Sequence, residues 1–327
     1  MAGKGTRLRP HTLTTPKPLL PVAGTMLIER IIGSFAASLD REISEIAFVL
    51  GDFGKDVEQQ LSQMTQRFGA KASFYYQLEA LGTAHAVNCA AESLTGEVIV
   101  AFADTLFEVD GAIDLEGADS VIWLKKVEDP SRYGVALLEE GQITGFVEKP
   151  SEPVSDMAII GVYYFRDGER LQKELQYLMD NDIRGHKSEF DLTDAIDRLL
   201  KQNAVFRPAD VSQWLDFGTI PAWISSTAEV LERMESRPDL ASRYPGSTII
   251  QPCHIGDGVT IKNSVIGPCA SIGDGCSIED SEVSHSIILD RAVIRNSQLE
   301  RSTVGSAAEI EGCRQEIHLG DYSTIRG

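Results

Sequence analysis

Short apolar runs rich in β-branched residues alternate with amphipathic stretches over roughly the first 235 residues. Stretches with helical periodicity occupy 26–38, 54–67 and 83–93, and 220–235 reads as a closing helix. The apolar runs predict buried strands at 45–50, 72–76, 97–102, 120–126 and 158–165. This alternation predicts an α/β, Rossmann-like domain with a mixed, mostly parallel sheet.

The pattern changes after residue 247, where aliphatic residues recur every six positions and the sequence IGDG occurs twice, at 255–258 and 272–275. The repeat begins with Ile249, Ile255 and Ile261 and continues through Ile310. A period of six predicts a short left-handed parallel β-helix of about three to four coils. We therefore expect a catalytic domain at 1–236, a linker at 237–247 and a hexapeptide-repeat β-helix at 248–327.

The formal net charge of −19 argues against nucleic acids and anionic membranes as partners, because both attract basic surfaces. The five cysteines show no metal-binding spacing, which favours a reducing, cytoplasmic location. The first 28 residues contain no acid and carry four cations, Lys4, Arg7, Arg9 and Lys17. Positive charge is therefore concentrated at the start of an acidic protein, as a site for a polyanionic small substrate requires.

The opening loop has the features of an anion cradle. Gly3 and Gly5 let backbone N–H groups approach an anion closely, Thr6 adds a hydroxyl, and Arg7 and Lys17 add charge. The loop lacks the Walker A pattern, and Leu8 stands where a dinucleotide fingerprint would have its third glycine. On composition alone, a solvated basic loop is an equally good interpretation.

The spacing of motifs resembles the sugar-1-phosphate nucleotidyltransferases, or NDP-sugar pyrophosphorylases. The opening reads Gly-x-Gly-Thr-Arg-Leu-x-Pro-x-Thr at 3–12, followed by Pro-Lys-Pro-Leu-Leu-Pro at 16–21. Further matching segments follow in the family's order at 77–86, 103–107, 129–134, 147–150, 160–163 and 214–219. One departure is Ala103, which replaces the usual glycine before Asp104. The resemblance covers nearly all of residues 1–235, and part of this family carries a β-helix after the catalytic domain.

The resemblance implies a role for each matching residue. Arg7, Lys17 and Lys149 would be catalytic, and Mg²⁺ would be bound by Asp104 and Asp216. The sugar pocket would be lined by Tyr133, Gly134, Glu148 and Gly161. The nucleotide would be bound by Ala2, Gly3, Gly5, Thr6, Gln77, Gly82 and Thr83. His11 and His85 receive no role, because an ionised sugar phosphate needs no general base. Residues 189–194 also resemble a family segment, and we interpret them as an N-terminal helix cap rather than a substrate contact.

The implied reaction joins an NTP and a sugar 1-phosphate to give an NDP-sugar and pyrophosphate. dTTP with glucose 1-phosphate is the first choice, GTP with mannose 1-phosphate the next, and UTP or CTP follow. A non-catalytic nucleotide-sugar-binding subunit is the alternative from another class, although Arg7, Lys17, Asp104 and Asp216 are all present.

The repeat domain admits two interpretations. It could transfer an acetyl group, with His254 or His285 as the base, or it could support a lid or a homo-oligomer, which we favour. The resemblance also implies an apolar strand directly before Met1. We therefore expect that the chain as given starts late or is truncated.

Overall fold

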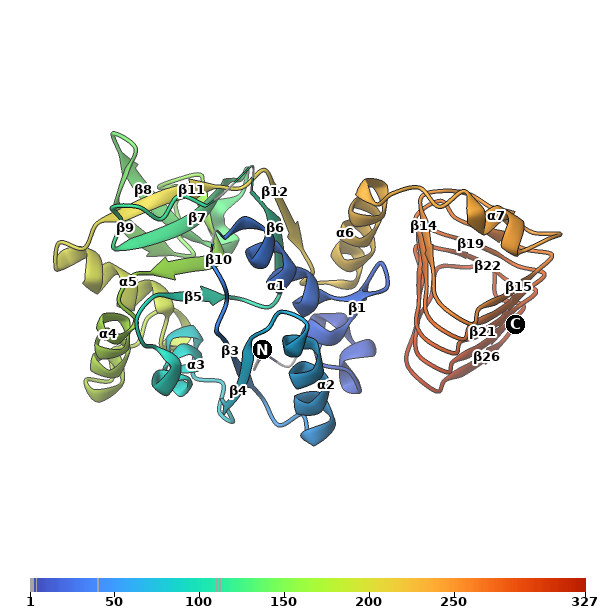
Figure 1. The fold of residues 1–327 in the computed structure, drawn as a ribbon, viewed down its shortest axis with the longest axis horizontal. Helices are drawn as coiled ribbons and strands as arrows, with labels where there is room; N and C mark the ends of the chain where they lie inside the picture. The colour runs from blue at the N-terminus through green and yellow to red at the C-terminus, as the bar shows by residue number, and fades with distance from the viewer. Residues whose placement is uncertain (1–2, 4, 40, 110, 112) are drawn as a thin grey trace. The chain divides into compact units, whose positions relative to one another are not determined.

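The computed structural model describes residues 3, 5–39, 41–109, 111 and 113–327 (Figure 1). These residues form two compact units. The first contains the described residues of Met1–Gly3 and Ile31–Trp214, and the second those of Lys4–Arg30 and Leu215–Gly327. The division at 236 and 247 expected from the sequence stays a prediction, and the two units are described separately below.

The first unit is built on a six-stranded sheet with the order β11-β7-β10-β8-β9, in which β5 also pairs with β10. A two-stranded sheet joins β3 to β4, and β6 pairs with β12. The bounds are β3 (Glu45–Leu50), β4 (Lys71–Tyr76), β5 (Val98–Ala101), β6 (Thr105–Glu108), β7 (Ser120–Lys126), β8 (Gly134–Glu139), β9 (Gln142–Glu148), β10 (Met157–Phe165), β11 (Phe206–Asp210) and β12 (Gln213–Asp216).

The expected mixed sheet is confirmed, but its expected parallel share is wrong. β10 runs antiparallel to β5, β7 and β8, and β8 forms an antiparallel hairpin with β9. Parallel pairing joins β3 to β4 and β7 to β11. The hairpin turns at Glu140 and Gly141, both with positive φ, which suits a tight hairpin turn. The alternation of strands and helices predicted from the sequence did not indicate this hairpin.

Helices cover the first unit's sheets. The bounds are α1 (Leu27–Ser38), α2 (Lys55–Gln66), α3 (Thr83–Cys89), α4 (Gly168–Asp180) and α5 (Leu192–Lys201). α3, α4 and α5 lie together beside the large sheet (Figure 1), and their apolar side chains form one core with those of β7, β9 and β10. Leu175 of α4 and Ile196 of α5 are fully buried in this core. The burial of one helix face stabilises the sheet that carries several of the matched motifs.

The strands β3 and β5 are among the edge strands of the first unit. Within the part of the chain that the structure describes, β3 pairs with β4 alone, and β5 pairs with β10 alone. Ala101 on β5 is exposed, and so is Ala47 on β3. The additional apolar strand expected from the sequence stays a prediction.

In the second unit, the opening segment and α6 are grouped with a parallel β-solenoid. The opening segment contains three 3-10 turns, Thr6–Leu8, His11–Leu13 and Lys17–Leu19, and the short strands β1 (Pro21–Val22) and β2 (Thr25–Met26). The closing helix is α6 (Ile220–Arg233), and its N-cap Thr219 accepts a hydrogen bond from the Ala222 N–H.

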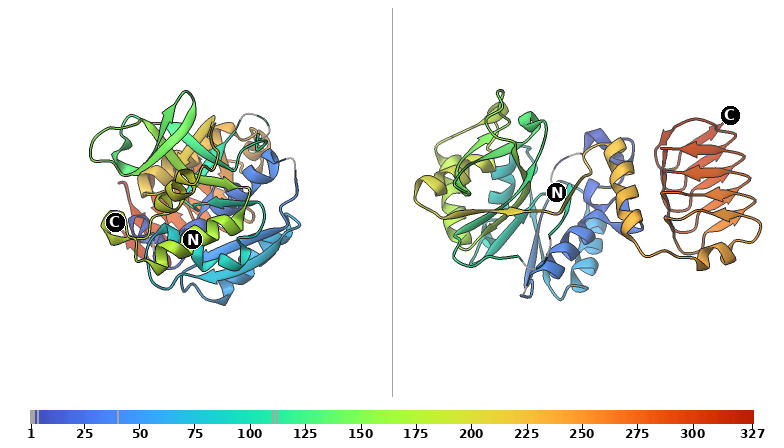
Figure 2. Two further views of the ribbon diagram at one scale, coloured as in Figure 1. Left: turned by 90° about the vertical axis from the view of Figure 1, so that its left-hand side faces the viewer. Right: turned by 90° about the horizontal axis from the view of Figure 1, so that it is seen from above.

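The solenoid has three parallel sheets, with five strands in two of them and four in the third. Figure 2 shows the stacked coils. The first sheet is β13 (Thr248–Ile249), β16 (Val265–Ile266), β19 (Glu282–Ser284) and β22 (Gln298–Glu300). The second is β14 (Cys253–Ile255), β17 (Ala270–Ile272), β20 (Ile287–Ile288), β23 (Thr303–Val304) and β25 (His318–Leu319). The third is β15 (Thr260–Lys262), β18 (Ser277–Glu279), β21 (Val293–Arg295), β24 (Glu309–Glu311) and β26 (Thr324–Arg326).

The solenoid has about five coils, so the expectation of three to four was too low. The six-residue period fades near the C-terminus, yet His318 and Leu319 still pair with Thr303 and Val304. The inward column of the second sheet is Ile255, Ile272, Ile288, Val304 and Leu319. The first four belong to the solenoid's buried apolar core, and the partly buried Leu319 packs against it. The parallel β-solenoid is confirmed, and its left-handedness stays a prediction.

Buried serines link successive coils of the solenoid. The Ser281 N–H donates to Ser264 Oγ at 3.1 Å, and the Ser297 N–H donates to Ser281 Oγ at 3.0 Å. Asn263, Asp280 and Asn296 have positive φ values, a conformation that asparagine and aspartate tolerate better than most residues. The small and polar residues between the aliphatic positions therefore satisfy the backbone where the chain turns.

The segment predicted as a linker contains the helix α7 (Asp239–Arg243). Its Leu240 is buried among the apolar side chains of the solenoid core, and α7 packs against β13, the first strand of that domain. Repeat arrays need a cap at their ends, because the terminal coil has no neighbour to cover it. The two prolines and the glycine of this segment are typical of a linker, and for that reason the cap was not predicted.

Candidate functional site

The opening loop is held in a tight turn around Gly5, which has a φ of 56°. Its carbonyl accepts the Leu8 N–H at 2.9 Å and the Thr12 hydroxyl at 2.7 Å. A Cβ at Gly5 would lie 3.1 Å from Thr12 Cγ2 and 3.4 Å from Lys17 Cβ. Gly5 is therefore required by its backbone conformation and by close packing, and the turn brings it beside Lys17.

The other described residues predicted to bind phosphate at the start of the chain are exposed. Gly3 is exposed, and a Cβ there would meet nothing within 4 Å. Ala2 lies outside the described residues. Thr6 and Arg7 are exposed on the first 3-10 turn, and Leu8 anchors that turn with only 1% of its surface exposed. The turn therefore directs a hydroxyl and a guanidinium outward from a buried leucine.

Arg7 and Asp216 both face Gly218 in the second unit. The Gly218 N–H donates to Asp216 Oδ1 at 2.7 Å. A Cβ at Gly218 would lie 2.9 Å from Asp216 Oδ1 and 3.1 Å from a terminal nitrogen of Arg7. The Ser226 hydroxyl donates to the Asp216 carbonyl at 2.8 Å, which fixes the end of β12 against α6. The structure thus brings one predicted phosphate-binding cation close to one predicted metal-binding carboxylate.

His11 is buried in the second unit. It is 1% exposed, its Nε2 lies 2.7 Å from Thr303 Oγ1, and its ring packs edge-on against Trp223 with the centroids 5.3 Å apart. Its Nδ1 is buried with no hydrogen-bond partner in the described structure. Burial lowers the pKa of His11 to about 4, against an opposing effect of Asp321 and with a further lowering by His318.

We expect His11 to make the protein less stable as the pH decreases. Its pKa is lower in the folded state than in the unfolded state, so the unfolded state binds more protons between pH 6.5 and about 4. Between pH 7 and pH 5 this difference lowers the unfolding free energy by about 2 kcal/mol. Urea unfolding at both pH values measures it. In a His11→Asn variant, the decrease in unfolding free energy between pH 7 and pH 5 is expected to be smaller by that amount. An unchanged decrease would contradict the attribution of this pH dependence to His11.

In the first unit, the predicted base-recognition segment is clamped to residues 190–192. Gln77 Nε2 donates to the Gly82 carbonyl at 2.9 Å and lies 2.9 Å from His85 Nδ1. The Leu192 N–H donates to Thr83 Oγ1 at 2.9 Å. A Cβ at Gly82 would lie 2.4 Å from the Phe190 carbonyl oxygen, and the φ of Gly82 is 116°. The structure therefore brings Gln77, Gly82 and Thr83 together, and their role in base recognition stays a prediction.

His85 also belongs to this group, although sequence reasoning gave it no role. Burial lowers the pKa of His85, and the charge of Glu79 partly opposes that effect. A neutral imidazole accepts a hydrogen bond at its unprotonated nitrogen, so Nδ1 is suited to receive the Gln77 amide. His85 thus helps to fix the orientation of Gln77.

The predicted sugar-binding segment converges at the start of β8 and the end of β9. Gly134 is the register partner of Glu148, and a Cβ at Gly134 would lie 2.8 Å from Glu148 Oε2. Glu148 accepts Lys149 Nζ at 2.7 Å on Oε1 and the Thr193 hydroxyl at 2.8 Å on Oε2. The Tyr133 carbonyl accepts the Lys149 N–H at 3.1 Å. Four predicted residues therefore form one group, with Thr193 as an unforeseen member.

Two acids from the same segment as Thr193 also join this group. Asp191 is 5% exposed, and burial, reinforced by the charge of Glu148, raises its pKa to about 6. Burial also raises the pKa of Asp194, with smaller effects of Asp197 and Glu148. Asp191 stands at the N-cap position of α5, but its Oδ2 accepts the His186 N–H at 2.9 Å and its side chain caps nothing in α5. Helix α5 begins in this segment, but the expected capping role is wrong, because the Asp191 side chain bonds to the His186 N–H instead. The segment contacts both predicted pockets.

Gly161 lies apart from the hydrogen-bonded group around Glu148. It has a φ of 82° within an irregularity of the β10–β7 pairing, and its carbonyl accepts the Phe102 N–H at 2.9 Å. A Cβ there would lie 2.8 Å from Phe102 Cδ2. Phe102 precedes the half-buried Asp104 by two residues. In this structure Gly161 shapes the strand end that leads to Asp104.

A metal ion would need oxygen ligands from these segments. Within the described residues, no group of three or more His, Cys, Asp and Glu side chains has a metal-binding arrangement. Asp104 and Asp216 supply carboxylate oxygens, which suit Mg²⁺, an ion that often takes one or two carboxylates and fills its remaining positions with water and phosphate oxygens. The donor chemistry of the two residues therefore fits that ion.

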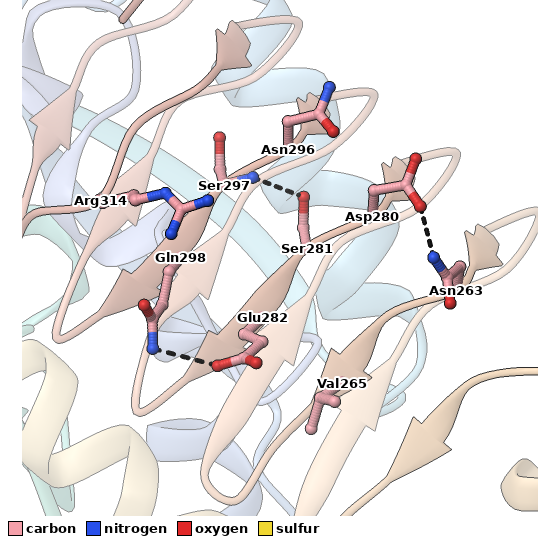
Figure 3. Close-up of a pocket in the computed structure, with 9 residues that line it drawn as sticks. All are labelled: Asn263, Val265, Asp280, Ser281, Glu282, Asn296, Ser297, Gln298 and Arg314. Carbon is pink, nitrogen blue, oxygen red and sulfur yellow. Dashed lines mark hydrogen bonds between the residues drawn. The ribbon is translucent and has the colours of Figure 1, made fainter.

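A groove on the solenoid lies outside all these segments (Figure 3). Its lining includes Asp280, Glu282, Gln298 and Arg314, and Figure 3 shows Gln298 donating to Glu282 across adjacent coils. Neither histidine of the acetyl-transfer alternative lines this groove. His254 instead packs on Gly24, where a Cβ would lie 2.2 Å from its ring. This groove therefore gives no support to the acetyl-transfer alternative.

Two further observations concern the cysteines and the helices. The five cysteines, Cys89, Cys253, Cys269, Cys276 and Cys313, are free thiols. Among the described residues, no helix is long and apolar enough to cross a membrane.

The chain is similar to known proteins over nearly its full length. The sequence profile of the nucleotidyl transferase family matches residues 1–233. A glucose-1-phosphate thymidylyltransferase of Streptomyces griseus is 30% identical over 98% of this chain and 96% of that protein. The catalytic subunit beta of mannose-1-phosphate guanylyltransferase from Drosophila melanogaster is 27% identical over 100% of this chain and 90% of that protein. In fold, the chain resembles a nucleoside-diphosphate-sugar pyrophosphorylase of Vibrio cholerae, with a TM-score of 0.58, 18% identity, and coverage of 69% of this chain and 97% of that one.

Proposed function

The chain belongs to the nucleotidyl transferase family and is a sugar-1-phosphate nucleotidyltransferase, and we propose that it joins dTTP to glucose 1-phosphate. The observation that carries this choice is the 30% identity to the Streptomyces thymidylyltransferase over almost the whole of both chains. Activity with GTP and mannose 1-phosphate is the second candidate, because the Drosophila guanylyltransferase subunit also matches over the whole chain.

In the proposed reaction, a phosphate oxygen of the sugar 1-phosphate attacks the α-phosphorus of the triphosphate. The bond from that phosphorus to the bridging oxygen of the β-phosphate breaks, and pyrophosphate leaves. The attacking oxygen is already ionised, so the protein needs no general base. Its task is to bring two anions together and to neutralise the charge that develops.

The opening loop would bind the triphosphate. Gly5 packs closely against Thr12 and Lys17, and the exposed side chains of Thr6 and Arg7 are directed outward beside it. Arg7 would stabilise the charge of the departing pyrophosphate, and Lys17 would contact the phosphates from the other end of the loop. Ala2 and Gly3 stay predicted members of this cradle.

The first unit would select the base and the sugar. Because Gln77 Nε2 is bonded to Gly82 and held near His85, its carbonyl oxygen Oε1 is the atom suited to a donor on the base. Thr83 and Gly82 would complete that contact. The Glu148 carboxylate would accept sugar hydroxyls, with Tyr133, Gly134 and Gly161 shaping the pocket, and Lys149 would bind the sugar phosphate.

Enzymes of this family generally use a divalent metal ion. We assign Asp104 and Asp216 as the carboxylates that would hold Mg²⁺, which when bound would neutralise phosphate charge. A cytoplasmic location and assembly into a homo-oligomer are part of the same proposal.

Pyrophosphate release from purified protein tests the proposal. Each of dTTP, UTP, GTP and CTP is combined with glucose, mannose, galactose and N-acetylglucosamine 1-phosphates in the presence of Mg²⁺. We expect the highest kcat/KM with dTTP and glucose 1-phosphate. A higher value with GTP and mannose 1-phosphate would replace the first candidate by the second. Nucleotide-sugar binding without turnover of any pair would identify a regulatory subunit.

A further inference from the structure

One outward face of the solenoid is covered. His254, Ser271, Ile287, Thr303 and His318 pair in successive coils of the second sheet. Each stands next to a residue of the inward column, so these side chains point outward. Ser271, Ile287 and Thr303 are nevertheless at most 3% exposed, and none of them belongs to the solenoid's apolar core. Another part of the same unit therefore lies against this column.

Residues 10–24 of the opening segment contact this face at both of its ends. At the first coil, Gly24 lies against the His254 ring so closely that a side chain at Gly24 would collide with it. At the last coils, His11 Nε2 lies 2.7 Å from Thr303 Oγ1, and the Thr14 hydroxyl donates to Asp321 Oδ2 at 2.6 Å. Thr303 Oγ1 is also 3.1 Å from His318 Nδ1.

The contact at the last coils is connected directly to the phosphate loop. Thr12, the residue after His11, donates its hydroxyl to the Gly5 carbonyl at 2.7 Å. The Thr15 N–H donates to the His11 carbonyl at 3.2 Å, two residues before Lys17. The buried His11 therefore links the solenoid to both parts of the loop. It is next to Thr12, which bonds to Gly5, and its carbonyl bonds to Thr15, two residues before Lys17.

We propose that the solenoid positions the phosphate-binding loop, with Thr303 and His11 as positioning residues for nucleotide binding and turnover. The proposal rests on the proposed function, because it assigns residues 5–17 to the triphosphate. It gives the repeat domain a task within a single chain, whether or not the domain also joins subunits. The most specific test of the proposal is the Thr303 hydroxyl, because this atom contacts the His11 ring.

The test compares Thr303→Val with Thr303→Ser in the full chain. Valine has nearly the shape of threonine but leaves the buried His11 Nε2 without its partner, whereas serine keeps the hydroxyl. We expect Thr303→Val to lower kcat/KM for the nucleotide by about five- to tenfold, with KM for the sugar 1-phosphate unchanged. Thr303→Ser is expected to stay within about twofold of the parent.

A matched control removes a buried hydroxyl elsewhere in the solenoid. Ser281 is 4% exposed, donates to the Glu279 carbonyl and accepts the Ser297 N–H, so Ser281→Ala also breaks buried hydrogen bonds. It lies on the face with the polar groove, away from the column that His11 contacts. We expect it to lower stability without changing kcat/KM for the nucleotide.

Hydrogen exchange separates the failure of this inference from the failure of the proposed function. The amides of Leu8, Leu13 and Thr15 donate within the opening segment. We expect faster exchange at these amides in Thr303→Val and parent-like exchange in Thr303→Ser and Ser281→Ala. Parent-like exchange in Thr303→Val, or faster exchange with parent-like affinity for Mg²⁺-dTTP, would overturn the inference. A parent protein that turns over no substrate pair would instead refute the proposed function, and exchange and nucleotide affinity would still decide the positioning role.

Discussion

Replacing Asp104 with asparagine is expected to lower kcat by about 10²–10³-fold while leaving the fold intact. The change keeps the shape of a half-buried side chain directly before β6 and removes only the charge that would attract a divalent ion. Pyrophosphate release measured against Mg²⁺ concentration tests it. The loss should be accompanied by a rise in the Mg²⁺ concentration needed for half-maximal activity.

Asp180→Asn is the control for this experiment, because Asp180 is an exposed carboxylate at the end of α4. Its loss of charge should leave turnover unchanged. Full activity in Asp104→Asn would remove Asp104 from the metal site, and circular dichroism of both variants would show whether the fold is retained.

Arg7→Gln is expected to lower kcat by about 10²-fold and to weaken nucleotide binding, with little effect on KM for the sugar 1-phosphate. The Arg7 guanidinium is exposed on the first 3-10 turn and points to the Gly218 segment that carries Asp216. In the proposed reaction, a charge at that position would act most strongly on the departing pyrophosphate, and therefore on kcat. Steady-state kinetics with each substrate varied in turn provide the measurement.

Arg9→Gln is the matched comparison, since Arg9 is also exposed and lies two residues further along the same loop. If the loop acts only through its total charge, both variants will lose activity equally. If Arg7 makes a specific contact, the loss in Arg9→Gln will be less than about a tenth of that in Arg7→Gln, and the remaining charge effect will vanish at high salt.

Most strands and helices could be predicted from the pattern of apolar residues, because buried strands and amphipathic helices have distinct periods. Strands 45–50 and 120–126 match β3 and β7 at both ends. The antiparallel direction of β10 could not be predicted, since a buried central strand has the same apolar composition in either direction. The fifth coil was missed because its turns depart from the six-residue period, although the backbone pairing continues.

In the candidate site, too, some residues could be predicted from the sequence and others could not. Gln77, Gly82 and Thr83 are close in sequence, and the structure confirms that they are close in space. Thr193 and Asp191 could not be recognised, because their link to Glu148 depends on how α5 packs against β9. A threonine or an aspartate at the start of a helix has a sufficient local explanation as a cap, which concealed the second role.

The sequence by itself determined the chemistry of this protein: a basic glycine loop, the order of the motifs and a repeat with an aliphatic residue every six positions. These properties are local, so they can be seen without knowing how the chain folds. Only the tertiary structure decided which residues share a pocket and what the repeat domain contacts. His11 and Thr303 lie 292 positions apart, and neither has a neighbour that marks it as a partner of the other. Their contact arises because the opening segment, which also carries the proposed phosphate loop, covers an outward face of the solenoid.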